Sequence, residues 1–141
     1  MADSGCAVTS IAIGISCSGT GVTVENFDAK ALIDTLNANS CFTGTGAIYW
    51  GCRGIQEIAP SVSLVGTYNP GSSSATKELV ESQDPNNTFV LLHFVNSAHP
   101  RGHYVVYTST EGDYFVTKDP AGGVVSKVLI SQVDQVVVYS Y

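Results

Sequence analysis

A cysteine placed directly before an apolar segment is the residue of this sequence best suited to do chemistry. Cys6 follows Gly5, and residues 7–16 carry apolar side chains at positions 7, 8, 11, 12, 13 and 15. This pattern predicts a helix that is apolar nearly all round and therefore buried. A thiol at a helix N-terminus lies beside unpaired backbone N–H groups, whose partial positive charge favours the thiolate. Cys6 is therefore a candidate nucleophile.

Three histidines could act as the base for this thiol. His93 lies in the apolar run 89–94, which predicts a strand buried on both faces and a histidine whose hydrogen bonds are satisfied there. His99 lies in a polar loop, where we expect it to be solvated. His103 follows Gly102 at the start of a predicted strand, where a side chain can face a cleft. A histidine at a strand start more often has a structural role, but His103 has a carboxylate nearby.

Asp119 is the carboxylate expected to orient His103. Residues 103–110 and 114–117 predict two strands joined by a tight turn at 111–113. Counting outward from this turn brings His103 and Asp119 to about the same level, or one or two places apart with a bulge. Cross-strand neighbours have Cβ atoms about 4.5–5.5 Å apart, within reach of a hydrogen bond from an imidazole N–H to a carboxylate. The alternative is that residues 119–123 form a plain turn.

The elements that must position these residues form a helical front and a strand-rich back. Helices are predicted over residues 7–16, from 23 to 36, over 47–59, and from 72–74 to 81. Strands are predicted over residues 62–67, 89–95, 103–110, 114–117 and 135–139, with 124–133 ambiguous. Helices followed by antiparallel strands indicate an α+β fold. We expect a single domain over residues 1–141, with its helices packed on one side of a curled antiparallel sheet.

Composition excludes several classes of protein. The formal net charge of −6 over 141 residues argues against binding nucleic acid or docking unaided on anionic membranes or wall polymers. No apolar run approaches the roughly 20 residues that span a bilayer, and the first residues do not resemble a secretory signal. Only 13% of residues are charged, so Ser, Thr, Asn and Gly must cover much of the surface. Such a surface is typical of secreted or virion-borne proteins, and we expect an extracellular or virion-associated location.

The remaining cysteines leave two possibilities open. Cys17, Cys41 and Cys52 do not have the short C-x-x-C spacing of zinc sites, so we expect neither a metal nor a cofactor. The first possibility is that all three are buried small hydrophobic side chains. The alternative is one disulfide, either Cys41–Cys52 or Cys17–Cys52.

Three short motifs, taken in order, resemble those of the C39-like cysteine peptidases. They are Gly-Cys-Ala-Val-Thr-Ser at 5–10, Gly-His-Tyr-Val-Val-Tyr at 102–107 and Asp-Pro-Ala-Gly at 119–122. The resemblance covers nearly the whole chain, and Ile48-Tyr49-Trp50 looks like the mid-chain helix of the family. It implies a papain-like fold with Cys6 as nucleophile, His103 as general base and acid, and Asp119 as the residue that orients His103.

The resemblance also implies a substrate. Relatives include leader peptidases of bacteriocin exporters and bacterial or phage wall-cleaving enzymes, such as endolysins. The implied substrate is a peptide, or a stem or cross-bridge peptide of peptidoglycan. Residues expected to line its cleft are Tyr49, Trp50 and Tyr104, although aromatic side chains in such a pattern more often belong to the core.

The sequence departs from the family pattern just before the nucleophile. Family members usually carry a glutamine several residues before the cysteine, and its amide donates to the oxyanion. Residues 1–5 contain no glutamine, which leaves the backbone N–H of Cys6, with Ser4 or Asp3 as substitutes. Losing one such donor typically lowers the rate by about 10²–10³-fold. We expect a domain cut from a longer protein or particle; the alternative is a catalytically impaired binding module or structural domain.

Overall fold

The computed structural model is built on one six-stranded antiparallel sheet with the strand order β1-β6-β2-β3-β4-β5. It describes residues 10–11, 14–15, 29–42, 49–58, 60–84, 86–97, 100, 102–118 and 125–141. The strands are β1 (Ser63–Tyr68), β2 (Thr88–Phe94), β3 (His103–Glu111), β4 (Tyr114–Lys118), β5 (Val125–Leu129) and β6 (Val133–Ser140). The helices are α2 (Ala29–Ala38), α3 (Gly54–Ile58), α4 (Ser73–Glu81) and the 3-10 turn η2 (Ile130–Gln132). Residues 10, 11, 14 and 15 are also helical.

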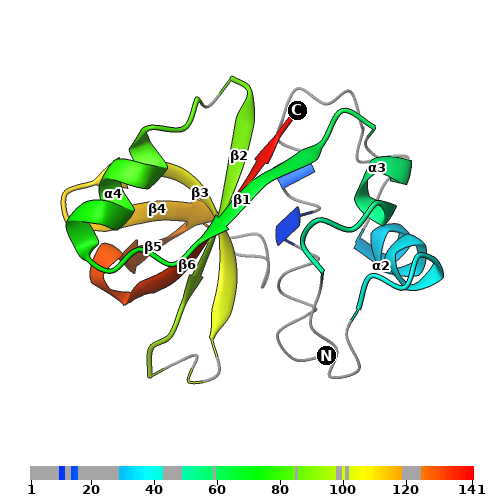
Figure 1. Cartoon of the computed structure of the whole chain (residues 1–141). Coiled ribbons are helices and arrows are strands. Elements are labelled where there is room, and N and C mark those ends of the chain that lie inside the picture. Colours follow the sequence, from blue (N-terminus) through cyan, green and yellow to red (C-terminus); the bar gives the residue numbers. More distant parts are fainter. Residues whose placement is uncertain are drawn as a thin grey trace.

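Helices cover both faces of the sheet (Figure 1). Leu32 of α2 and Ile55 of α3 pack with one face in a first core cluster, whereas Val80 of α4 packs with the other face in a second. The predicted α+β class and antiparallel sheet are confirmed. The expectation that all helices lie on one side is wrong for α4, because its apolar residue Val80 is only 1% exposed beneath the sheet's second face. None of the helices that the structure describes is long and apolar enough to cross a membrane.

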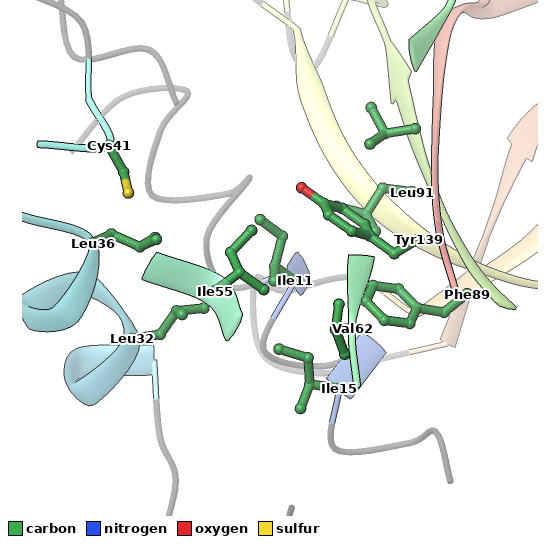
Figure 2. Packing of buried hydrophobic residues seen from close by; sticks show 11 residues of the cluster. Ile11, Ile15, Leu32, Leu36, Cys41, Ile55, Val62, Phe89, Leu91 and Tyr139 are labelled. Atoms are coloured by element: carbon green, nitrogen blue, oxygen red, sulfur yellow. The ribbon is translucent and has the colours of Figure 1, made fainter. Parts of the chain in front are cut away.

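The first core cluster includes two isoleucines of the front helical segment, which is described at residues 10–11 and 14–15. Figure 2 shows Ile11 and Ile15 between the side chains of α2 and α3 and those of the sheet. Both are fully buried, as expected for the apolar pattern over residues 7–16. Gly14, between them, lies directly against the ring of Phe89, since an added Cβ would be 2.6 Å from its Cε2 atom. The front segment therefore packs closely on β2 at Phe89.

α2 agrees with the helix predicted from 23 to 36 where the structure describes it. Leu32 and Leu36, one helical turn apart, are both fully buried in the first core cluster. The helix ends at Ala38, two residues after the predicted end, and Ser40 adopts a positive φ of 57°. Residues 23–28 of the predicted helix lie outside the described residues.

The third predicted helix is much shorter than expected. We predicted it over residues 47–59, but α3 covers only Gly54–Ile58, and residues 49–53 form turns. The backbone groups of this segment bond elsewhere: the Tyr49 amide donates to the Cys41 carbonyl at 2.8 Å, and the Trp50 carbonyl accepts from the Tyr139 hydroxyl at 2.8 Å. Burial raises the pKa of Tyr139, so this hydroxyl stays protonated and able to donate. These tertiary contacts override the helical pattern.

A disulfide closes the same segment. Cys41 and Cys52 are bonded, with their Cα atoms 5.6 Å apart. The expectation that both are free buried thiols is therefore wrong, and the alternative Cys41–Cys52 bridge is confirmed. Cys17 lies outside the described residues. The bridge ties the end of α2 to the residues just before α3.

The local signals in the second half of the chain are largely confirmed. Ser72 caps α4, because its side chain accepts a hydrogen bond from the Ala75 amide at 3.2 Å. The hairpin between β3 and β4 turns at Gly112, whose φ of +60° suits glycine. The ambiguous residues 124–133 contain β5, η2 and the start of β6.

The close approach of Gly14 to Phe89 predicts that Gly14→Ala destabilises the protein. In a helix alanine is ordinarily favoured over glycine by about 1 kcal/mol, so helix propensity alone predicts a gain. The added methyl group instead overlaps a ring held by stacking on Tyr139, with centroids 5.3 Å apart. Overpacking of this kind costs about 1–3 kcal/mol. We expect a lower urea midpoint for Gly14→Ala.

Gly71→Ala is the matched control for this substitution. An added Cβ at Gly71 meets no atom within 4 Å, so we expect a change within about 0.5 kcal/mol. Equal urea midpoints for the two variants would mean that the front segment does not pack on Phe89.

The disulfide predicts a second effect on stability. The sequence separation of Cys41 and Cys52 is 11, and closing a loop of this size stabilises a protein by about 3 kcal/mol. We expect the double variant Cys41→Ser, Cys52→Ser to lose about this free energy of unfolding. A reducing agent should bring the wild-type protein to the same urea midpoint and leave the double variant unchanged. A double variant as stable as the oxidised wild type would contradict the bridge.

Candidate active site

His103, the predicted base, is the first residue of β3 and is almost completely buried. Its side chain is 3% exposed, and its ring lies edge-on against Phe94, with the centroids 5.8 Å apart. Phe94 is also its partner in the β2–β3 register. The strand start predicted at His103 is confirmed.

The side chains of His103 and its neighbour Tyr104 point to opposite faces of the sheet. Tyr104 packs against the first core cluster, whereas Val105 belongs to the second. Side chains alternate along a strand, so His103 shares the face of Val105 and of Phe94. The imidazole is thus packed at the end of the sheet, beside the second core cluster.

A hydrogen bond joins the front segment to the strand of His103. The Ser10 hydroxyl donates to the Tyr104 carbonyl oxygen at 3.0 Å, across 94 positions of sequence. Ser10 itself is fully buried. The residue four places after Cys6 therefore lies against the residue that follows His103.

Several predicted site residues lie outside the described residues. These are the nucleophile Cys6, the oxyanion candidates Asp3 and Ser4, and the orienting residue Asp119. The described β3–β4 ladder ends at the pair Val106↔Lys118, one residue before Asp119. Its register shifts between Tyr107 and Ser109, which is the kind of irregularity that the predicted pairing allowed for.

The three aromatic residues expected in the cleft differ in their surroundings. Tyr49 is 54% exposed. Trp50 is partly buried against the first core cluster and lies edge-on to Tyr104, with the centroids 5.1 Å apart. Trp50 and Tyr104 therefore form an aromatic pair beside the contact that Ser10 makes.

A second histidine has a carboxylate partner that the sequence did not reveal. His93 was expected to be satisfied within a buried strand, and its Nδ1 atom lies 2.5 Å from Asp134 Oδ1. The His93 side chain is 17% exposed and that of Asp134 is 56% exposed, so the pair lies at the rim of the sheet. Asp134 was missed because it stands alone between Val133 and Gln135, and only the pairing of β2 with β6 brings it to His93.

Other features of the described residues give no rival centre. No group of three His, Cys, Asp or Glu side chains in the described part of the chain is placed to hold a metal ion. A pocket lies beside α4, on the side of the sheet away from Ser10, and its lining includes Ser73, Lys77, Asp113 and Ile130. It contains neither a histidine nor a cysteine. The described histidines that could act as a base, His93 and His103, therefore lie near the end of β2 and at the start of β3.

Comparison with known proteins agrees with this architecture. The structure is similar to a candidate C39-like peptidase from Bacillus anthracis, with 16% identity and a TM-score of 0.58 over 99% of this chain and 89% of that chain. It is also similar to the peptidase domain of Streptococcus ComA, a bifunctional ABC transporter involved in quorum sensing. That match has 12% identity and a TM-score of 0.56 over 99% of this chain and 93% of that domain.

At these identities the structural likeness shows the fold. A search of curated protein sequences found no match. The sequence itself matches the model of the Peptidase_C39 like family over residues 1–140. The chain therefore belongs to the C39-like peptidase family.

Proposed function

We propose that the protein is a cysteine peptidase in which Cys6 is the nucleophile, His103 the general base and acid, and Asp119 the residue that orients His103. The hydrogen bond from Ser10 to the Tyr104 carbonyl is the observation that carries this proposal. Four residues of chain span at most about 14 Å, so a Cys6 that reaches the start of β3 is compatible with this bond, which supports the proposal. Asp119 is likewise tethered, because it follows Lys118 at the end of the described ladder.

The proposed mechanism needs only these three side chains and nearby backbone N–H groups. The Cys6 thiolate attacks the carbonyl carbon of an amide, and the backbone N–H of Cys6, with that of Ser4 or Asp3, donates to the oxyanion. His103 donates its proton to the departing amine as the C–N bond breaks. The neutral imidazole then takes a proton from water, whose oxygen attacks the thioester and releases the acid and the thiolate.

The proposed substrate is a peptide, or a stem or cross-bridge peptide of peptidoglycan. Membership of a peptidase family supports a peptide in general. The Trp50–Tyr104 pair lies on the side of the sheet that the front segment packs against, and we propose that it lines the cleft together with the exposed Tyr49. We also propose that the protein cleaves cell walls. We propose for it a location outside the cell or on a virion, and a place in a larger polypeptide or particle.

One observation favours a second candidate function. His103 is 3% exposed and packs beside Phe94 on the face of the sheet opposite to Tyr104. The burial of this imidazole favours a catalytically impaired binding module or structural domain that keeps the peptidase fold. The two candidates differ in the reactivity they give to Cys6.

Alkylation of Cys6 by iodoacetamide tests the proposal directly. With Cys41 and Cys52 in a disulfide, Cys17→Ser leaves Cys6 as the single free thiol of the chain. A thiolate stabilised by an imidazolium reacts at neutral pH, whereas a free cysteine has a midpoint near pH 8.5. We expect Cys6 to react faster than free cysteine at pH 7, with a pH midpoint below about 7.5.

Variants assign the roles in this assay. His103→Ala should move the pH midpoint toward that of free cysteine, and Asp119→Asn should move it less far. Cys6→Ser in the same background should abolish labelling. The proposal would be wrong if Cys6 of the parent protein reacted no faster than free cysteine. Fast labelling without cleavage of peptides or of purified peptidoglycan would favour the binding module.

The link between Ser10 and Tyr104 makes a separate prediction. Ser10→Ala leaves the part-buried Tyr104 carbonyl without this donor, which costs about 1–3 kcal/mol of stability. Because the same bond holds the segment after Cys6, we expect the alkylation rate at pH 7 to fall several-fold. Ser63→Ala is the control, since its exposed contact with Ser140 lies on β1 and β6. An unchanged rate in Ser10→Ala would show that this contact does not hold the nucleophile in place.

A further inference from the structure

A histidine outside the proposed mechanism lies in the middle of a row of polar side chains across three strands. His93 of β2 is in register with Tyr104 of β3 and with Gln135 of β6. The Tyr104 ring lies 4.7 Å from the His93 ring, and its hydroxyl donates to Gln135 Oε1 at 2.8 Å. The Tyr104 side chain therefore spans the imidazole from one neighbouring strand to the other.

A bulge in β6 supplies the second contact of this imidazole. His93 pairs with Gln135 and Phe94 pairs with Val133, which leaves Asp134 as the extra residue. Bulges re-aim side chains at sheet ends, often beside active sites. Here the bulge residue is Asp134, and its carboxylate meets His93 Nδ1, so the rotation of the ring is fixed.

The Nε2 and Cε1 atoms of the His93 ring lie against the backbone of Gly102, the residue before His103. A Cβ added to Gly102 would lie 2.5 Å from His93 Cε1 and would overlap Nε2. Gly102 has a φ of +93°, which favours glycine, and it is bonded directly to His103. The His93 ring thus sets where the chain turns into β3.

From these contacts we infer that His93 is a positioning residue for His103, held in its working rotation by Asp134 and Tyr104. This inference rests on the proposed function, in which His103 is the base. The rest of β2, Thr88-Phe89-Val90-Leu91-Leu92 and Phe94, is almost entirely apolar, so packing alone does not account for an imidazole with a carboxylate partner. A displacement of about 1 Å in a catalytic group can cost about 100-fold in rate.

Asp134→Ala tests the inference without disturbing the core, because Asp134 is 56% exposed. Freed from its carboxylate, the His93 ring can rotate and no longer holds Gly102. We expect Cys6 alkylation at pH 7 to fall about tenfold and its pH midpoint to move toward that of free cysteine. Asp134→Asn keeps an acceptor oxygen and should stay within about threefold of wild type.

Glu111→Ala is the matched control for loss of an exposed carboxylate. Glu111 is 64% exposed and bonds Lys127 at 2.9 Å, away from His103. It should leave both the alkylation rate and its pH profile unchanged, while its thermal unfolding changes as little as that of Asp134→Ala.

A glycine pair tests the contact with Gly102 itself. Gly112→Ala introduces a side chain at φ +60° with no atom within 4 Å, so it measures backbone strain alone. Gly102→Ala adds the overlap with His93 and should lower Cys6 reactivity far more. In a His93→Ala background the difference between the two variants should shrink.

The outcomes separate this inference from the proposed function. Suppose that Asp134→Ala and His93→Ala keep the wild-type rate and pH profile of Cys6 alkylation, whereas His103→Ala loses the reactivity. This result would overturn the positioning role of His93 and leave the peptidase proposal standing. Reactivity lost in His93→Ala but kept in His103→Ala would overturn it as well, by making His93 the base. Failure of the proposed function itself would appear earlier, as an unreactive Cys6 in the parent protein.

Discussion

The structure depends on the packing of the front helical segment against the sheet. Two contacts fix this segment: Gly14 lets its backbone meet the ring of Phe89, and the Ser10 hydroxyl bonds the Tyr104 carbonyl. Ile11 and Ile15 then fill the space between the sheet and the two helices α2 and α3 (Figure 2). A bulkier residue at position 14 would hold the helix away from β2. Without this close approach, the proposed nucleophile Cys6 would have no fixed position relative to the start of β3.

The disulfide segment and the sheet support this arrangement from two sides. The Cys41–Cys52 bridge closes a turn that carries Trp50, which contacts Tyr104 through its ring and Tyr139 through its carbonyl. On the sheet, Tyr104 is bonded to Gln135 and covers His93. Tyr104 therefore contacts both the disulfide segment and the polar row, and its carbonyl oxygen accepts the hydrogen bond from the Ser10 hydroxyl. The proposed site is built around the residue that follows His103.

Local patterns in the sequence predicted what local forces decide. The buried front segment, the start of α4 at residues 72–74 and the hairpin turn at Gly112 depend on apolar periodicity, capping and positive φ, which neighbouring residues determine. The prediction of a long helix over residues 47–59 was wrong, because the Tyr49 amide bonds the Cys41 carbonyl and the Trp50 carbonyl accepts from Tyr139 of β6. The His93–Asp134 pair was missed for a similar reason, since a bulge between distant strands creates it. Family membership followed from three ordered motifs, whereas the geometry around His103 depends on long-range packing.

A crystal structure of the protein with Cys6 as a free thiol would measure the distance between Cys6 Sγ and the nearest imidazole nitrogen. The account predicts that this nitrogen belongs to His103, about 3–4 Å away, with Asp119 on the other side of the ring. It also predicts that His93 lies behind Gly102 and does not contact the thiol. A Cys6 thiol buried away from His103, or one paired with His93 and Asp134, would contradict the central claim.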